Sequence, residues 1–380
     1  MASFSFNTTK SILCEPGCSE QLGEKARELG IERLLIVTDE GIANLGIMDV
    51  ALHSLATSGI SVAVYKGVLA DPPESVVYDA LALARQVDAN GICGFGGGSS
   101  MDVAKLVALL CATGEDLPAV YGVGNARGER LPLIQVPTTA GTGSEVTPIA
   151  IVTTGETTKQ GVVAPQLLPD LALLDADLTL GLPASVTAAT GIDAMVHAIE
   201  AFTSKIKKNP YSDMLAREAL RLLSANIVDA VEHGGNRVTR SNMLFGSMLA
   251  GQAFANAPVA AVHALAYPLG GHYHISHGLS NSLVLPHVLR FNLTACDALY
   301  GELAQVIDPD LPATGEALIA KMESLIEQVK LPRTLVEMNV PEKDLAMLAK
   351  DAMLQQRLLV NNPREVTEGD ALQLYQAAFG

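Results

Sequence analysis

The chain has 380 residues, 49% of them hydrophobic, and a formal net charge of −16 at pH 7. That charge argues against a nucleic acid or an anionic membrane as partner, because a protein that follows phosphates needs a face rich in Lys and Arg. No apolar run reaches the ~18 residues of a membrane span, and we see no pattern of a secretory leader. The five cysteines are odd in number and scattered, which argues against a disulfide framework. We therefore expect a cytoplasmic protein.

The first part of the chain alternates short β-branched apolar runs with longer segments of helical periodicity, a pattern typical of parallel βαβ units. Strands are predicted over residues 33–39, 61–68, 91–97 and 132–139, and helices over 49–59, 74–87 and 99–112. The strand pattern nearly stops after residues 171–183, and long helical segments follow over 184–204, 212–231 and 239–256. A chain of 380 residues is longer than a domain with a single hydrophobic core usually is. We therefore predict an α/β domain over residues 1–180 and an all-α domain over 181–380.

Asp39 ends the first of these strands. A carboxylate at the carboxyl end of a parallel strand can accept hydrogen bonds from a ribose diol, and it repels the additional phosphate of NADP. Asp39 therefore predicts a preference for NAD over NADP as the cofactor. The alternative is an Asp that caps the next helix or is simply solvated.

Two donor-rich loops follow later strands. The stretch GFGGGSSMD leads from a buried strand through Gly97 and Gly98 into a helix that is predicted to begin at Ser99. Glycines let the backbone approach a pyrophosphate, and the helix N-terminus offers unpaired N–H groups, although a plain tight turn has the same composition. The stretch PTTAGTGSEVTP follows another strand and gathers hydroxyl and amide donors, among them Thr138, Thr139 and Thr142. Two such loops at strand ends predict a dinucleotide crevice.

The helical half carries a candidate metal site. Asp193 and His197 are four residues apart in a helical pattern and so project from the same face. His263 and His277, which are flanked by glycines, could close on that face and give one carboxylate and three imidazoles. Such a set suits Fe²⁺ or Zn²⁺ with an open position for a substrate oxygen. Any one of these histidines taken alone reads equally as a core or surface residue.

Two more histidines, His272 and His274, lie between the last two candidate ligands. They could support the ligands, relay protons or be solvated. The residues alone leave these three roles open.

Four stretches together resemble the iron-containing (group III) alcohol dehydrogenases: GGGSSMD, PTTAGTGSEVTP, DAMVHAIEAF, and HALAYPLGGHYHISHGLSNSLVLPHV. The resemblance covers essentially the whole chain, in order. It implies an N-terminal nucleotide-binding α/β domain and an all-α C-terminal domain of the dehydroquinate-synthase-like type, with the active site in the cleft between them. It also implies a homodimer joined through an N-terminal strand edge.

The resemblance assigns roles by motif. The metal ligands match Asp193, His197, His263 and His277. The cofactor-binding positions match Asp39, Gly97, Gly98, Ser99, Asp102, Thr138, Thr139, Thr142 and Lys159.

The chain departs from the family pattern at two positions. Tyr267 stands where many members have a second histidine near the nicotinamide and substrate. Because a phenol has a reference pKa of about 10, it relays protons less well than imidazole at neutral pH, so Tyr267, His272 and His274 are all candidates for proton handling. Asp71 stands where relatives often have Asn.

The predicted function is hydride transfer between a metal-bound primary alcohol and NAD, with Fe²⁺ as the metal by resemblance and Zn²⁺ as the alternative. Alternatives on the same scaffold are a hydroxyacid-oxoacid transhydrogenase, a glycerol-type polyol dehydrogenase and a dehydroquinate-synthase-like lyase. These call for charged or polar pockets, whereas AFANAPVAAVHALAYPLG offers apolar walls. A catalytically silent nucleotide-binding protein is the alternative from another class.

Overall fold

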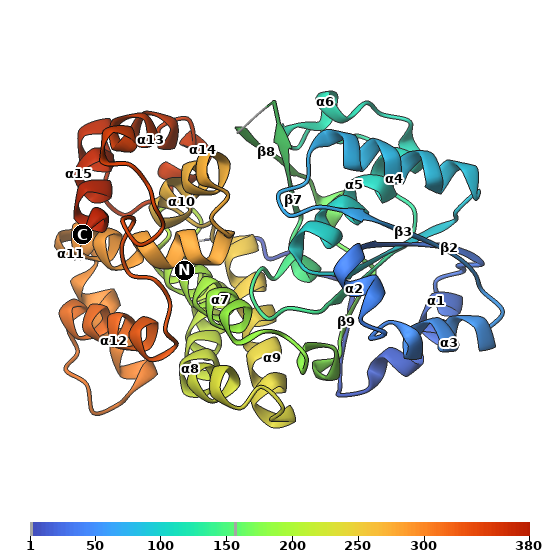
Figure 1. Ribbon diagram of the computed structural model, residues 1–380, viewed down its shortest axis with the longest axis horizontal. Helices are drawn as coiled ribbons and strands as arrows, with labels where there is room; N and C mark the ends of the chain where they lie inside the picture. The colour runs from blue at the N-terminus through green and yellow to red at the C-terminus, as the bar shows by residue number, and fades with distance from the viewer. Residues whose placement is uncertain (1–2, 156–157) are drawn as a thin grey trace. The chain divides into compact units, whose positions relative to one another are not determined.

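The computed structural model describes residues 3–155 and 158–380, which divide into two units (Figure 1). One unit contains residues 7–139 and 143–180, and the other contains residues 1–6, 140–142 and 181–380. The first is built around a parallel sheet with helices, and the second is helical. The predicted fold class, α/β followed by all-α, is therefore confirmed.

The α/β unit is organised by a six-stranded parallel sheet in the order β1-β9-β6-β4-β2-β3. Its strands are β1 (Ser11–Cys14), β2 (Arg33–Asp39), β3 (Ser61–Val68), β4 (Gly91–Gly96), β6 (Leu133–Pro137) and β9 (Leu171–Leu174). Every residue of β4 and β6 is buried. Because helices cover both faces of such a sheet, its central strands are continuous apolar runs without alternation. The predicted bounds of β2 and β3 agree with the structure, and those of β4 and β6 agree within two residues.

Helices on the two faces of this sheet enclose two separate apolar cores. One core gathers the buried faces of α4 and α5, and the other those of α1 and α3. The helices of the unit are α1 (Leu22–Glu28), α2 (Glu40–Asn44), α3 (Asp49–Thr57), α4 (Glu74–Gln86), α5 (Gly98–Thr113) and α6 (Leu117–Val120).

A second, three-stranded sheet in this unit was not predicted. Its order is β5-β8-β7, with β5 (Gly122–Val123), β7 (Ile149–Thr154) and β8 (Thr158–Val163). β7 and β8 are antiparallel. β7 reads IAIVTT, an apolar β-branched run that the sequence reasoning overlooked, whereas its partner β8 reads TKQGVV and has no such run at its start.

The helical unit is built around α7 (Ala184–Thr203), which packs against α8, α9 and α11. Nearly all residues of α7 after its first turn are buried, which explains its continuous apolar pattern. The other helices are α8 (Pro210–Glu232), α9 (Arg237–Asn256), α10 (Ala261–Tyr273), α11 (His277–Ile307), α12 (Gly315–Gln328), α13 (Leu345–Ala352), α14 (Gln356–Leu359) and α15 (Glu368–Phe379).

Helices α11 and α7 approach each other unusually closely at Gly278. A Cβ atom at this position would lie 2.3 Å from the backbone oxygen of Ala189. Any side chain here would force the helices apart, so the glycine fixes how near α11 comes to the ligand-bearing face of α7.

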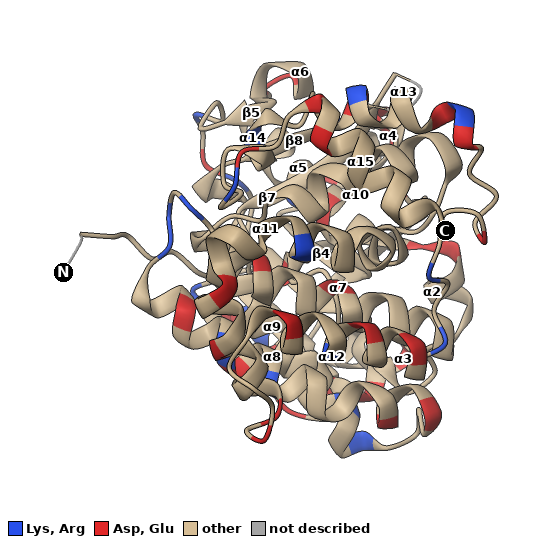
Figure 2. Cartoon of the chain, turned by 90° about the vertical axis from the view of Figure 1, so that its left-hand side faces the viewer, with Lys and Arg blue, Asp and Glu red and all other residues tan. Residues whose placement is uncertain are grey.

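Acidic residues are spread over the outer helices on the face shown in Figure 2, with basic residues scattered among them. Among the described helices, none combines the length and the apolar character that crossing a bilayer requires.

Candidate metal centre and cofactor loops

Three helices of the helical unit bring the four predicted metal ligands together. Asp193 and His197 come from α7, His263 from α10, and His277 is the first residue of α11. Their ligand atoms all lie within 4.8 Å of one another. Measured from Asp193 Oδ1, the Nε2 atoms of His197 and His263 lie at 3.9 Å and that of His277 at 3.6 Å.

Hydrogen bonds at the other ring nitrogen orient two of the imidazoles. His263 Nδ1 lies 2.6 Å from a carboxylate oxygen of Glu200, and His197 Nδ1 lies 3.2 Å from the backbone oxygen of Gly141. Because both partners only accept hydrogen bonds, each Nδ1 carries the proton and each Nε2 presents its lone pair to the cluster.

Glu200 is a functional residue that the sequence reasoning missed. Besides His263, it accepts hydrogen bonds from the backbone N–H groups of Ala260 (3.0 Å) and Val262 (2.7 Å), and so fixes the start of α10. It follows His197 by three residues on α7 and therefore lies on the same helix face. That spacing was the available signal.

Three of the four candidate ligands are buried from solvent. Asp193, His197 and His263 are 1%, 4% and 2% exposed, whereas the His277 side chain is 36% exposed. Burial lowers the pKa of His197 to about 3, so its ring is neutral and able to ligate a metal. For Asp193, burial acts to raise the pKa, but the three imidazoles and a hydrogen bond from Asn281 outweigh it and lower the pKa below the ordinary value.

These residues fit a divalent first-row metal. Bonds of about 2.0–2.2 Å to four tetrahedral ligands place the ligand atoms ~3.4 Å apart, close to the distances from Asp193 Oδ1. A carboxylate and neutral imidazoles are the donors that such ions accept, and the exposed side at His277 is where a fifth ligand could be added to these four.

Aromatic side chains border the ligands. The Phe254 ring stacks on His197 at 4.3 Å between centroids, and the Tyr267 ring lies 5.9 Å from His277. The other two proton-handling candidates have different surroundings. His272 Nε2 lies 2.7 Å from a carboxylate oxygen of Asp351 on α13, and His274 is exposed with a φ of 54°. Within residues 3–155 and 158–380, neither His272 nor His274 forms a hydrogen bond or a ring contact with a candidate ligand.

The two predicted cofactor loops meet at the carboxyl ends of β4 and β6. The Thr138 N–H donates to the Gly96 oxygen at 2.9 Å. Gly96 has a φ of 150°, and a Cβ there would lie 2.8 Å from the Ser100 hydroxyl, so only glycine fits. Gly97 precedes α5 without a side-chain cap, and no acidic residue lies in the first turn. The N–H groups of Gly98 and its neighbours therefore stay available to an anion.

Thr142 belongs to the other unit. Ala140–Thr142 cluster with the helical residues, and a Cβ at Gly141 would lie 2.6 Å from the Thr190 side chain. The Thr-rich loop thus contributes Thr138 and Thr139 to the α/β unit and Thr142 to the unit that holds the metal ligands.

The surroundings of Asp39 agree with both of its predicted roles, as a cap of the next helix and as a residue beside the cofactor loop. Its Oδ1 accepts a hydrogen bond from the Ile42 N–H at 2.9 Å and caps α2. Its Oδ2 lies 3.7 Å from the Cβ position of Gly96, beside the glycine turn. One oxygen is therefore structural and the other faces the loop. Lys159 is ion-paired with Asp71 at 2.6 Å and hydrogen-bonded to Thr153 at 3.0 Å.

Asp102 lies in a buried network that joins α5 to the loop after β6. Its carboxylate accepts from the Ser144 hydroxyl (2.6 Å) and the Ile151 N–H (2.9 Å). Lys105, fully buried, donates to Ser144 at 2.7 Å and to the Ile149 oxygen at 2.6 Å, and its Nζ lies 3.6 Å from Asp102. The sequence reasoning missed Lys105. The network stabilises the base of the loops.

Replacing Lys105 with Met is expected to lower the free energy of unfolding by about 3–5 kcal/mol, because Asp102 would keep a buried charge without its cation. Urea unfolding of both proteins measures this. Lys321→Met on α12 is the surface control, expected to stay within about 0.5 kcal/mol of the wild type. Equal stability of all three proteins would contradict the assigned role.

Comparison with known proteins decides the family. The family model described as "Iron-containing alcohol dehydrogenase" matches residues 9–176, and the C-terminal model of the same family matches residues 187–379. The chain belongs to the iron-containing alcohol dehydrogenase family. It is thus an oxidoreductase that acts on alcohols or aldehydes.

Relatives of this alcohol dehydrogenase match along its whole length. Long-chain-alcohol dehydrogenase 1 of Geobacillus thermodenitrificans is 39% identical over 371 residues, covering 96% of this chain and 93% of the relative. A crystal structure of a 1,3-propanediol oxidoreductase has a TM-score of 0.96 at 36% identity and covers 100% of both chains. Sulfoacetaldehyde reductase of Bifidobacterium kashiwanohense, solved in complex with NAD⁺, has a TM-score of 0.90 at 28% identity and covers 100% of this chain and 99% of its own.

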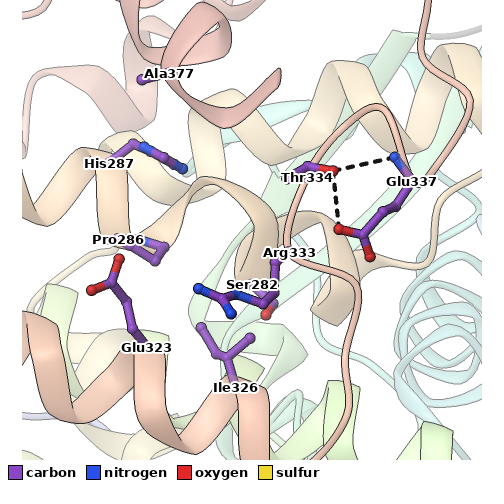
Figure 3. A pocket seen from close by; sticks show the side chains of 9 residues that line it. All are labelled: Ser282, Pro286, His287, Glu323, Ile326, Arg333, Thr334, Glu337 and Ala377. Carbon is purple, nitrogen blue, oxygen red and sulfur yellow. Dashed lines mark hydrogen bonds between the residues drawn. The ribbon is translucent and has the colours of Figure 1, made fainter. Parts of the chain in front are cut away.

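The alcohol dehydrogenase has a hollow of about 390 Å³ beside α11 and α12 (Figure 3). Ser282, Pro286 and Arg333 line it. Pro286 follows His277 by nine residues, which at 100° per residue places it on the opposite face of α11. The metal ligands do not line this hollow.

Proposed function

We propose that the enzyme transfers a hydride between a primary alcohol at the metal centre and NAD, in either direction. The observation that carries the proposal is the convergence of Asp193, His197, His263 and His277 on one point. When bound, a divalent metal, Fe²⁺ by family, supplies the Lewis acidity that lowers the pKa of an alcohol hydroxyl, and NAD supplies the hydride acceptor.

The chain's own residues position the reactants. The four ligands would hold the metal, and Glu200 orients His263. Phe254 covers His197 and keeps water from that side of the cluster. The exposed edge of His277 is where the substrate hydroxyl would enter. Tyr267, whose ring lies 5.9 Å from His277, is then the candidate to hold or pass the hydroxyl proton at its phenolic oxygen.

The cofactor loops support NAD as the partner. The N–H groups at the start of α5 and the hydroxyls of Thr138 and Thr139 would receive the pyrophosphate, as anions bind at helix N-termini. Asp39 would accept from the ribose, and the related sulfoacetaldehyde reductase was solved with NAD⁺. We assign Asp102 and Lys159 to support of these loops, because Asp102 accepts a hydrogen bond from Ser144 and Lys159 is ion-paired with Asp71.

Asp39→Asn separates the charge of this residue from its capping role. Asn caps helices as well as Asp does, so α2 should be retained, while repulsion of a 2′-phosphate is lost. The ratio of kcat/KM with NADP to that with NAD should rise by about 10–100-fold, which corresponds to about 1.4–2.7 kcal/mol. Steady-state kinetics with both cofactors measure it. An unchanged ratio, with helical content kept in circular dichroism, would contradict the selector role of Asp39.

The buried apolar residues next to the ligands favour a substrate with an apolar chain. Phe254, Ala257, Val259 and Ala260 join the end of α9 to the start of α10, where His263 lies. A long-chain-alcohol dehydrogenase is among the relatives. We therefore favour primary alkanols over polyols and hydroxyacids.

Turnover of a series of primary alkanols, glycerol and 2-hydroxyglutarate, after loading with Fe²⁺ without oxygen, tests the proposal. Reduction of NAD with the alkanols should be fastest. Preference for 2-hydroxyglutarate or glycerol would select one of the alternative reactions. Absence of turnover with metal and NAD both bound would favour a silent nucleotide-binding protein.

We propose that the enzyme is located in the cytoplasm and that it forms a homodimer. Its cysteines are free thiols, as a reducing compartment requires. β1 is an edge strand of the large sheet and offers unpaired backbone groups to a second copy. Light scattering coupled to size-exclusion chromatography tests the dimer, for which a mass near 39.8 kDa would be contradictory.

A further inference from the structure

A carboxamide that belongs to none of the four candidate ligands lies beside three of them. Asn281 follows His277 by one helical turn on α11 and is fully buried. Its Nδ2 donates to Asp193 Oδ1 at 2.6 Å. The same nitrogen lies 3.3 Å from His277 Nε2 and 3.4 Å from His263 Nε2.

Two of these three neighbours accept hydrogen bonds. The Asp193 carboxylate is an acceptor, and His263 Nε2 bears a lone pair because its Nδ1 donates to Glu200. An amide nitrogen has two N–H groups, so one of them can stay on the Asp193 carboxylate while the other faces the histidine side of the cluster. The other end of the amide differs, because Asn281 Oδ1 is buried and has no hydrogen-bond partner among the described residues.

Packing of the helices brings this amide into place. Gly278 lets α11 approach the backbone of α7, and a Cβ there would lie 3.3 Å from the Asp193 Cβ and 2.3 Å from the Ala189 oxygen. The Asn281 side chain is short, so it reaches Asp193 only at this separation. Its position is thus a consequence of the fold around the cluster.

We propose that Asn281 is a positioning residue of the metal centre, which holds the Asp193 carboxylate through Nδ2 and organises the ligand set for the metal. The inference rests on the proposed metal site. Without the amide, Asp193 loses the only hydrogen bond to its carboxylate that the described residues show. The carboxylate would then be free to turn away from the histidines.

Two variants and one matched control test the proposal. Asn281→Ala removes the amide, and Asn281→Asp keeps its shape but replaces the donor with a second acceptor beside Asp193. Asn292→Ala is the control, because Asn292 is also a buried amide on α11 but bonds to Asn362 at 3.0 Å, away from the ligands. The probe is Zn²⁺ alone, and its dissociation constant is measured by competition with a chromogenic chelator.

Asn281→Ala should weaken Zn²⁺ binding by about 10–100-fold, in the range seen for partners of metal ligands, while Asn292→Ala should bind as the wild type does. Asn281→Asp should melt below the wild type without metal and show a larger rise in melting temperature when Zn²⁺ is added, because the cation offsets the paired carboxylates. Wild-type affinity in Asn281→Ala, or a rise in Asn281→Asp no larger than that of the wild type, would overturn the role of Asn281. Failure of the wild type to bind Zn²⁺ or Fe²⁺ would instead overturn the proposed function.

Discussion

Replacing Asp193 with Ala or Asn is expected to lower kcat/KM for a primary alkanol by about 1,000-fold or more. Asp193 Oδ1 is the atom from which all three imidazole Nε2 atoms lie within 3.9 Å, and it supplies the only negative charge of the cluster. Lewis-acid assistance is worth several kcal/mol, and each 1.4 kcal/mol is a factor of ten in rate.

Steady-state kinetics after Fe²⁺ loading, together with metal content, measure this effect. Asp310→Ala, an exposed site in the same unit, serves as the control and should keep wild-type activity. Asp193→Asn is the sharper variant because it preserves volume. If it retained both bound metal and wild-type kcat/KM, the assignment of Asp193 would be wrong.

Replacing Glu200 with Ala should weaken metal binding by about 10–100-fold, although Glu200 does not point its oxygens at the metal position. The change leaves three donors without their acceptor, namely His263 Nδ1 and the N–H groups of Ala260 and Val262. Because each buried unsatisfied group costs about 1–3 kcal/mol, the metal-free protein should also lose stability.

Chelator competition and urea unfolding of the metal-free protein separate these two effects. Glu218→Ala is the control, since Glu218 forms an exposed pair with Arg221 on α8 and such pairs are worth about 0–1 kcal/mol. A Glu200→Ala protein that is less stable but binds metal as the wild type does would show that the residue only supports the fold.

The elements predicted most accurately from the sequence are those with a continuous pattern of apolar residues. β2 reads RLLIVTD and β3 reads SVAVYKGV, and both begin and end at the predicted residues. The helix 184–204 was predicted within one residue of α7. In contrast, β7 and β8 pair with each other through short, partly exposed segments. β7 begins with the apolar run IAIV, which the sequence reasoning overlooked, and β8 reads TKQGVV, which does not identify it as the partner strand.

The metal ligands could be predicted because helical spacing places Asp193 and His197 on one face. The supporting residues were missed: Glu200 shares that face by its spacing, but a Glu or Asn in a helix is normally interpreted as solvated. Glu200 is buried where it accepts hydrogen bonds from the start of α10, and Asn281 is buried where α11 packs on α7. Lys105 was missed for a similar reason, because its partners come from a segment about 40 residues away.

The most direct test of the metal centre is a crystal structure of the Fe²⁺-loaded protein with anomalous data at the iron edge. One peak per chain is expected, about 2.0–2.3 Å from Asp193, His197, His263 and His277. A peak bound elsewhere, or an iron-loaded protein whose peak is not ligated by these four side chains, would contradict the account.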